Sequence, residues 1–111
     1  MTAVVVLCTC PDPSTAEELA RALITQGLAA CVNLLPRITS IYRWQGEVEQ
    51  AEEQLLVIKT QTDVYPQLEE LIVQRHPYQV PEIVALPIVQ GLPAYLAWLT
   101  DALSPSSVSS P

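Results

Sequence analysis

The order of two kinds of apolar pattern constrains the fold of this chain more than any other feature. Residues 3 to 8 form an unbroken apolar run rich in β-branched side chains, which is typical of a strand buried on both faces. Residues 16 to 24 instead carry apolar side chains at the i, i+3, i+4, i+7 spacing of one helical face. Extended runs return at 29–44 and 55–58, a helical stripe follows at 64–72, and 78–88 is extended again. The chain therefore predicts the order β-α-β-β-α-β, with a short third helix beginning at Pro93.

Local signals predict where these elements begin and end. A capping box predicts the first helix over 14–26, with Ser14 as N-cap and Glu17 at N3, and Gly27 as its C-terminal stop. Asp63 is expected to cap the second helix, and Pro77 ends it.

The middle of the chain predicts a long hairpin. Gln45-Gly46 is a turn signal that joins an extended segment at 38–44 to another at 47–59. Pro36 lacks an N–H for the strand ladder, so it predicts a bulge in the first arm.

This order corresponds to the α+β, ferredoxin-like (split βαβ) fold, an antiparallel sheet with the helices on one face plus a C-terminal helix. We expect a single domain over 1–103 and a flexible Ser/Pro-rich tail over 104–111. One sheet face is left uncovered and the hairpin is longer than a small domain needs, so both features predict a partner chain.

Composition narrows the classes of partner. The 111 residues include 12 acidic and 5 basic side chains, a formal net charge of -7, which disfavours sequence-independent nucleic-acid binding. The chain is 50% hydrophobic and only 15% charged, which excludes general disorder and again favours an oligomer.

No membrane partner and a cytoplasmic location are expected. The N-terminus lacks the basic region of a secretory signal. The uncharged stretch 83–100 is interrupted by Pro87, Gly91 and Pro93 and does not read as one membrane span. The three cysteines show no disulfide framework and are expected to be reduced.

The chain carries no catalytic signature. It has no Gly-rich phosphate loop, no Cys-x-x-Cys and no His-Glu-x-x-His, and a serine triad would depend on its single histidine, His76. We expect no enzyme activity.

Two readings stay open for the cysteines and for the histidine. Cys8 and Cys10 are two apart on a strand and share a face, so with one imidazole they would suit copper or zinc, or they simply pack as small hydrophobes. His76 either caps the second helix or acts as a ligand or base.

Charges in apolar surroundings also allow two interpretations. Lys59 and Glu82 form an ion pair across neighbouring strands, or they belong to a polar pocket. That pocket, an inter-subunit cleft for a small anionic metabolite or a partner peptide, would be lined by Tyr42, Trp44, Lys59, His76, Tyr78 and Glu82. The adjacent carboxylates Glu17-Glu18, Glu52-Glu53 and Glu69-Glu70 are expected to be solvated surface.

Five sequence blocks resemble the CutA family of divalent-cation tolerance proteins. The match runs in order over about residues 4 to 100 and is carried by Leu28-Ala29-Ala30-Cys31-Val32-Asn33, Ser40-Ile41-Tyr42-Arg43-Trp44-Gln45-Gly46, Ile58-Lys59-Thr60, His76-Pro77-Tyr78-Gln79-Val80-Pro81-Glu82-Ile83 and Tyr95-Leu96-Ala97-Trp98-Leu99.

The resemblance implies a cytoplasmic homotrimer of PII-like architecture, linked to tolerance of copper and other divalent cations, with no required cofactor. It also implies copper binding, Cu(II) included, through a first-strand cysteine and two histidines before Pro-Tyr, which Cys8 and His76 match. Arg75 stands in place of the first histidine and cannot be a ligand, so copper binding is expected to be weak. The alternative is a small-ligand or partner-binding signalling or scaffold trimer with no dedicated metal site.

Overall fold

The computed structural model describes residues 2–103 of the chain. The elements in chain order are β1 (Ala3–Cys10), α1 (Pro13–Thr25), β2 (Cys31–Trp44), β3 (Glu47–Gln61), α2 (Tyr65–Arg75), β4 (Ile83–Pro87) and α3 (Pro93–Ala102). This order confirms the predicted arrangement. The tail predicted at 104–111 lies outside the described residues. None of the described helices has both the length and the apolar character that a membrane crossing requires.

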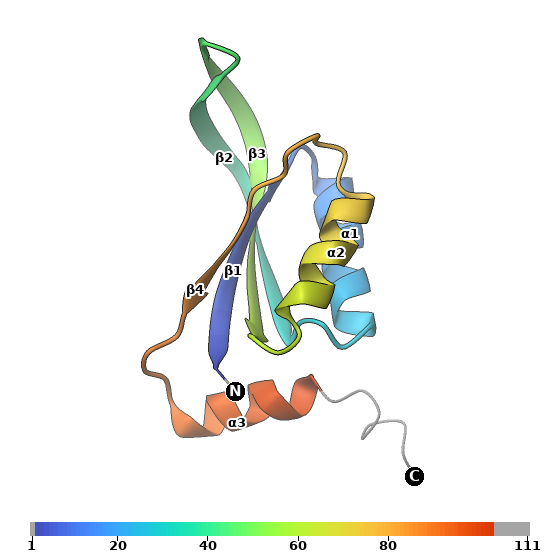
Figure 1. The fold of residues 1–111 in the computed structure, drawn as a ribbon, viewed down its shortest axis with the longest axis vertical. Helices are drawn as coiled ribbons and strands as arrows, with labels where there is room; N and C mark the ends of the chain where they lie inside the picture. The colour runs from blue at the N-terminus through green and yellow to red at the C-terminus, as the bar shows by residue number, and fades with distance from the viewer. Residues whose placement is uncertain (1, 104–111) are drawn as a thin grey trace.

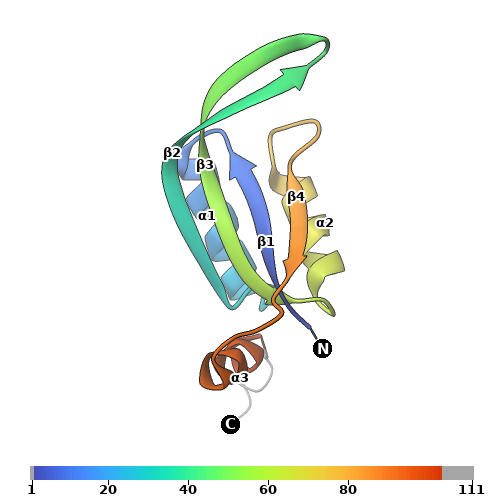
Figure 2. The ribbon, with the colours of Figure 1, turned by 90° about the vertical axis from the view of Figure 1, so that its left-hand side faces the viewer.

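The four strands form one sheet in the order β2-β3-β1-β4, and each neighbouring pair is antiparallel. Strand β3 lies between β1 and β2, which is the split βαβ arrangement expected from the sequence. Helices α1 and α2 pack on one face of the sheet (Figure 1). The other face is turned toward the viewer in Figure 2, with both helices behind it.

The core lies between the sheet and these two helices. Alternate residues of β1 face the helices, and so do their partners on β3, such as Ile58 opposite Val6. Helix α1 contributes the i, i+3, i+4, i+7 stripe of its sequence. The core residues are Val4, Val6, Cys8, Cys10, Ala16, Leu19, Leu23, Leu28, Ala29, Leu56, Ile58, Leu68, Leu71 and Ile72.

The prediction that Ser14 caps α1 is wrong. Asp12 is the N-cap, and its Oδ1 accepts a 2.7 Å hydrogen bond from the Thr15 N–H. Pro13 explains the difference, because its fixed φ angle suits the first helical position and moves the start of the helix ahead of Ser14. The C-terminal stop is confirmed, since Gly27 has a φ of 71° and the Leu28 N–H bonds the Leu23 carbonyl at 2.9 Å, as in a Schellman motif.

Helix α2 begins without the cap predicted at Asp63. Val64 holds the N-cap position and makes no side-chain cap hydrogen bond. The Val64 N–H bonds the Gln61 carbonyl at 3.2 Å, so a tight turn leads directly from β3 into the helix and leaves Asp63 inside that turn. Pro77 lies just after the helix, as predicted.

The hairpin has the predicted turn and the predicted bulge. Trp44 pairs with Glu47, and Gln45 and Gly46 between them have φ angles of 52° and 84°, which fits a type I′ turn. The register shifts between Leu35 and Ile38, where Pro36 interrupts β2. The hairpin tip projects beyond the rest of the sheet (Figure 2).

The sheet face opposite the helices is largely apolar and uncovered within the described residues. It carries Val5 and Leu7 of β1, and their β4 partners Leu86 and Val84 are 50% and 47% exposed. Helix α3 lies at one end of the sheet (Figure 1) and also leaves aromatic side chains exposed, since Trp98 is 47% accessible. Strand β4 is shorter than predicted, because residues 78–82 form no strand.

Candidate functional site

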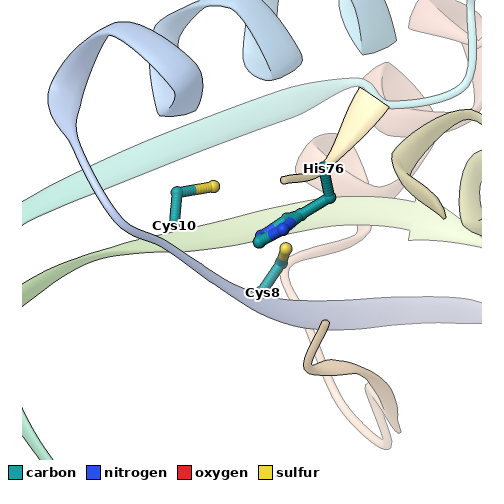
Figure 3. A group of neighbouring side chains, drawn as sticks. All are labelled: Cys8, Cys10 and His76. Carbon is teal, nitrogen blue, oxygen red and sulfur yellow. The ribbon is translucent and has the colours of Figure 1, made fainter. Parts of the chain in front are cut away.

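Cys8, Cys10 and His76 form one buried group, which we term the thiol–imidazole cluster. Their ligand atoms all lie within 4.8 Å of one another. Both cysteines come from β1 and are fully buried, and the histidine approaches from the end of α2 (Figure 3). Two residues predicted as metal ligands, Cys8 and His76, therefore meet in space, and Cys10 joins them because i and i+2 on a strand share a face.

Both ring nitrogens of His76 have hydrogen-bond partners. Nδ1 accepts from the Tyr78 N–H at 3.1 Å, so this nitrogen carries no proton. Nε2 lies 2.7 Å from the Thr9 carbonyl oxygen, which can only accept, so Nε2 carries the proton. The bonding thus defines a neutral imidazole.

His76 occupies the C-cap position of α2, as one of the two readings expected, but its side chain does not make the capping bonds. Only its backbone N–H bonds the helix, at 2.8 Å to the Ile72 carbonyl. The residue has an extended backbone, with a φ of -80° and a ψ of 137°, and its ring is hydrogen-bonded to β1. The side chain therefore joins the end of α2 to the end of β1.

The two thiols differ in acidity because they interact with each other. A hydrogen bond to Cys10 raises the pKa of the Cys8 thiol far above its ordinary value, and burial raises it further. The same hydrogen bond lowers the pKa of Cys10. The two shifts have opposite directions, so Cys10 is the thiol that ionises first.

The donor set fits a soft or borderline metal ion. Two thiolates and one imidazole suit copper or zinc, whereas hard ions such as magnesium prefer oxygen ligands. To bind a metal, His76 has to release one of its two hydrogen bonds, and Cys8 has to lose its proton. Arg75 is exposed at the end of α2 and is outside the cluster.

A cleft of about 590 Å³ lies beside the cluster, between the hairpin and the segment that follows α2. Of the six residues predicted to line such a cleft, Tyr42, Trp44, Tyr78 and Glu82 do so. Thr9, Ser40, Ile41, Glu53, Gln79 and Val80 complete its lining.

Lys59 and His76, the remaining two predicted cleft residues, do not line it. Lys59 donates a hydrogen bond to Oδ1 of Asn33. The predicted Lys59–Glu82 ion pair is also wrong, since the ion pair found within residues 2–103 joins Arg21 to Glu17. Strand β1 lies between β3, which carries Lys59, and β4, which follows Glu82, so the two strands are not neighbours.

Glu53 is the cleft residue whose burial the sequence did not predict. It is 6% exposed, and its Oε2 accepts a 2.7 Å hydrogen bond from the Tyr78 hydroxyl. The prediction that Glu53 is solvated surface is therefore wrong. Strand alternation gave no signal for this burial, because Leu55 and Val57, which share the sheet face of Glu53, lie on the side away from the helices and are only partly buried.

The cleft and the cluster share a wall. Thr9, near the end of β1, lines the cleft, and its backbone carbonyl accepts a hydrogen bond from Nε2 of His76. Tyr78 also lines the cleft, and its ring centroid is 4.7 Å from that of His76. The negative charges of Glu82 and Glu53 contribute to the raised pKa of Cys8, so the two sites interact electrostatically.

Comparison with known proteins gives one consistent result. The family model described as "CutA1 divalent ion tolerance protein" matches residues 4–102. The divalent-cation tolerance protein CutA of Thermus thermophilus is 54% identical over 87% of this chain and 94% of its own length. Its solved structure superposes with a TM-score of 0.86.

More distant relatives agree with this result. Protein CutA of Mus musculus is 48% identical over 93% of this chain, which spans only 60% of the mouse protein. A structure from Archaeoglobus fulgidus, called a periplasmic divalent cation tolerance protein, covers 91% of this chain and 98% of its own at 33% identity, with a TM-score of 0.88.

Proposed function

Because the chain belongs to the CutA1 divalent ion tolerance protein family, we propose that it serves in divalent-cation tolerance as a homotrimer that holds a copper or zinc ion at the thiol–imidazole cluster. The family is named for ion tolerance and not for an enzyme activity. The observation that carries the metal role is the convergence of Cys8, Cys10 and His76 within 4.8 Å.

The metal proposal takes its chemistry from this donor set. Copper is expected from the family resemblance, and the additional thiol of Cys10 favours Cu(I) or Zn(II), since thiolates are soft ligands. When bound, the ion would replace the proton that Cys8 now holds. Burial of the cluster would keep competing water and chelators away from the ion.

A metal titration with cysteine variants tests this role. Zn(II), which does not oxidise thiols, is titrated first and Cu(II) second, each against a competing chelator, in wild type and in Cys8→Ala, Cys10→Ala and His76→Ala. Each variant should bind at least about tenfold more weakly, a loss of about 1.4 kcal/mol. Cys31→Ala is the matched control, because this third cysteine lies outside the cluster and is free.

The titrations can support the metal site or overturn it. Tight binding in wild type and Cys31→Ala, with loss in the cluster variants that keep a native near-ultraviolet circular dichroism spectrum, supports the site. Unchanged affinity in all cluster variants overturns it, and the chain would then be a partner-binding or scaffold trimer with no dedicated metal site.

Self-association is supported by the uncovered sheet face. Val84 and Leu86 leave about half of their surfaces exposed beside Val5 and Leu7. An exposed, largely apolar face of this kind is typical of an interface. Light scattering coupled to size-exclusion chromatography should give three times the 12.2 kDa chain mass.

We place the protein in a reducing compartment, the cytoplasm. The support is chemical, because Cys8 and Cys10 lie close together as free thiols. Cell fractionation tests it, and recovery in a periplasmic or secreted fraction would contradict it.

A further inference from the structure

The cleft beside the thiol–imidazole cluster is lined by residues that take no part in the proposed metal binding. Its volume of about 590 Å³ lies within the range of small-molecule sites. Its walls come from the hairpin, from Thr9 at the end of β1, and from residues 78–82. Segments distant in the sequence thus converge on one concave surface.

The charges in the cleft have one sign. Glu53 and Glu82 line it, and none of the lining residues is a lysine, an arginine or the histidine. Glu53 is 6% exposed and accepts from the neutral Tyr78 hydroxyl, with no cation paired to it among residues 2–103. Since a buried carboxylate is unfavourable without a compensating charge, a cation bound beside Glu53 would be stabilised.

Three aromatic side chains line the same cleft as these carboxylates. Tyr42 and Trp44 come from the hairpin, Tyr78 follows α2, and all three line the cleft while more than a third of each side chain stays exposed. Aromatic faces attract organic cations through their quadrupoles. They offer no ligand to a hydrated metal ion, which would need several oxygens.

We propose that this cleft binds a small organic cation, an ammonium or guanidinium compound, with its charge between Glu53 and Glu82 and its alkyl groups against Tyr42, Trp44 and Tyr78. This replaces the anionic ligand expected from the sequence, because Lys59 and His76, the two basic groups in that expectation, do not line the cleft. The site is separate from the metal ligands.

A pair of isosteric probes tests the role of charge. Choline carries a quaternary ammonium group, and 3,3-dimethylbutanol has the same shape with a neutral carbon in its place. The chain has two tryptophans, so a Trp98→Phe variant makes the fluorescence report on Trp44 alone. Choline should change this fluorescence saturably and bind at least about tenfold more tightly than the alcohol. Agmatine tests the guanidinium arm in the same way.

Variants then locate the site. Glu53→Gln should weaken choline binding about tenfold, whereas the matched control Glu52→Gln, one residue away and exposed, should leave it unchanged. Because Glu53 is buried, its replacement can also affect folding, so Tyr42→Leu on the exposed hairpin provides a second test and should also weaken binding. Calorimetry is used for all variants.

Three results would overturn the proposal. One is the absence of saturable binding of both choline and agmatine, and another is equal affinity for choline and its neutral isostere. The third is a crystal structure of the self-associated protein in which an arginine or lysine of a second copy occupies the space between Tyr42 and Glu53. If the wild-type protein binds choline but no metal at the thiol–imidazole cluster, that result would contradict the proposed metal role and not the cleft proposal.

Discussion

The Nε2 atom of His76 lies 2.7 Å from the carbonyl oxygen of Thr9, a residue 67 positions earlier in the chain. This contact joins the end of α2 to β1 and requires the proton of the ring to lie on Nε2. It also places the imidazole against the Cys8 and Cys10 thiols. One hydrogen bond therefore connects the stability of the fold to the arrangement of the proposed metal site.

Replacing His76 should destabilise the protein even without metal. His76→Ala leaves the Thr9 carbonyl and the Tyr78 N–H without their partners, a loss of about 1–3 kcal/mol. Urea unfolding at a fixed chain concentration measures it. Arg75→Ala, one residue earlier and exposed, should change stability by less than about 0.5 kcal/mol. Equal effects of the two variants would contradict the role of the ring.

The start of α1 offers a test between two candidate caps. Asp12→Ala removes the hydrogen bond to the Thr15 N–H and should cost about 1 kcal/mol. Ser14→Ala should be nearly neutral, because Ser14 lies inside the helix and not at its cap. Thermal unfolding of both variants distinguishes them, and a larger loss in Ser14→Ala would restore the cap predicted from the sequence.

A charge on the open sheet face should disrupt self-association. Val84→Glu introduces a carboxylate where the uncovered face is apolar, so burial against another copy becomes unfavourable. Val73→Glu is the control, since Val73 is similarly exposed, at 56%, but lies on α2 on the helical side. Sedimentation velocity should show dissociation of the first variant only. Dissociation of both, or of neither, would place the interface elsewhere.

Tyr65 should make stability fall at alkaline pH. Burial, together with the hydrogen bond to Glu69, raises the pKa of the Tyr65 phenol from its ordinary value of 10.0 to about 12. The folded state thus holds this proton more tightly than the unfolded state does. The resulting stabilisation is complete below pH 10 and is lost as the pH rises from 10 through about 12.

Tyr65→Phe removes this titration. Wild type should therefore lose stability more steeply than the variant over that interval, measured by chemical unfolding at a series of pH values. The difference in tyrosinate absorbance between the two proteins reports the pKa directly. Identical pH profiles would show that the phenol is not perturbed by its surroundings.

Sequence patterns predicted most of the fold because the signals are local. The apolar periods, the turn at Gln45-Gly46 and the interruption at Pro36 each depend on a few neighbouring residues. The errors at Ser14 and Asp63 come from competing local signals, since Pro13 and the turn after β3 determined the helix starts instead. The prediction of a Lys59–Glu82 ion pair was wrong because it assumed that β3 and β4 are neighbours, and the order of strands in a sheet does not depend on local signals.

The candidate site was less predictable, because its residues meet only through the fold. The family resemblance indicated Cys8 and His76, and strand alternation indicated that Cys10 shares their side. Glu53 looked like surface beside Glu52, and only its contact with Tyr78, 25 residues away, explains its burial. Metal binding by Cys8, Cys10 and His76 is a prediction, which the metal titrations test.

The bulge in β2 has a consequence for the chemistry of the cleft. Before it, Leu35 pairs with Leu55, and after it, Ile38 pairs with Glu53, so β2 advances three residues while β3 advances two. The extra residue reverses which side chains of β2 point to each face of the sheet. Before the bulge, odd-numbered residues such as Leu35 share the face of Leu55. After it, even-numbered residues, Tyr42 and Trp44 among them, lie on that face. Deleting Arg37 would undo this reversal and exchange the aromatic wall of the cleft for Arg43 and its odd-numbered neighbours. A single-codon deletion could thus rewrite the ligand chemistry of the cleft while leaving every strand in place.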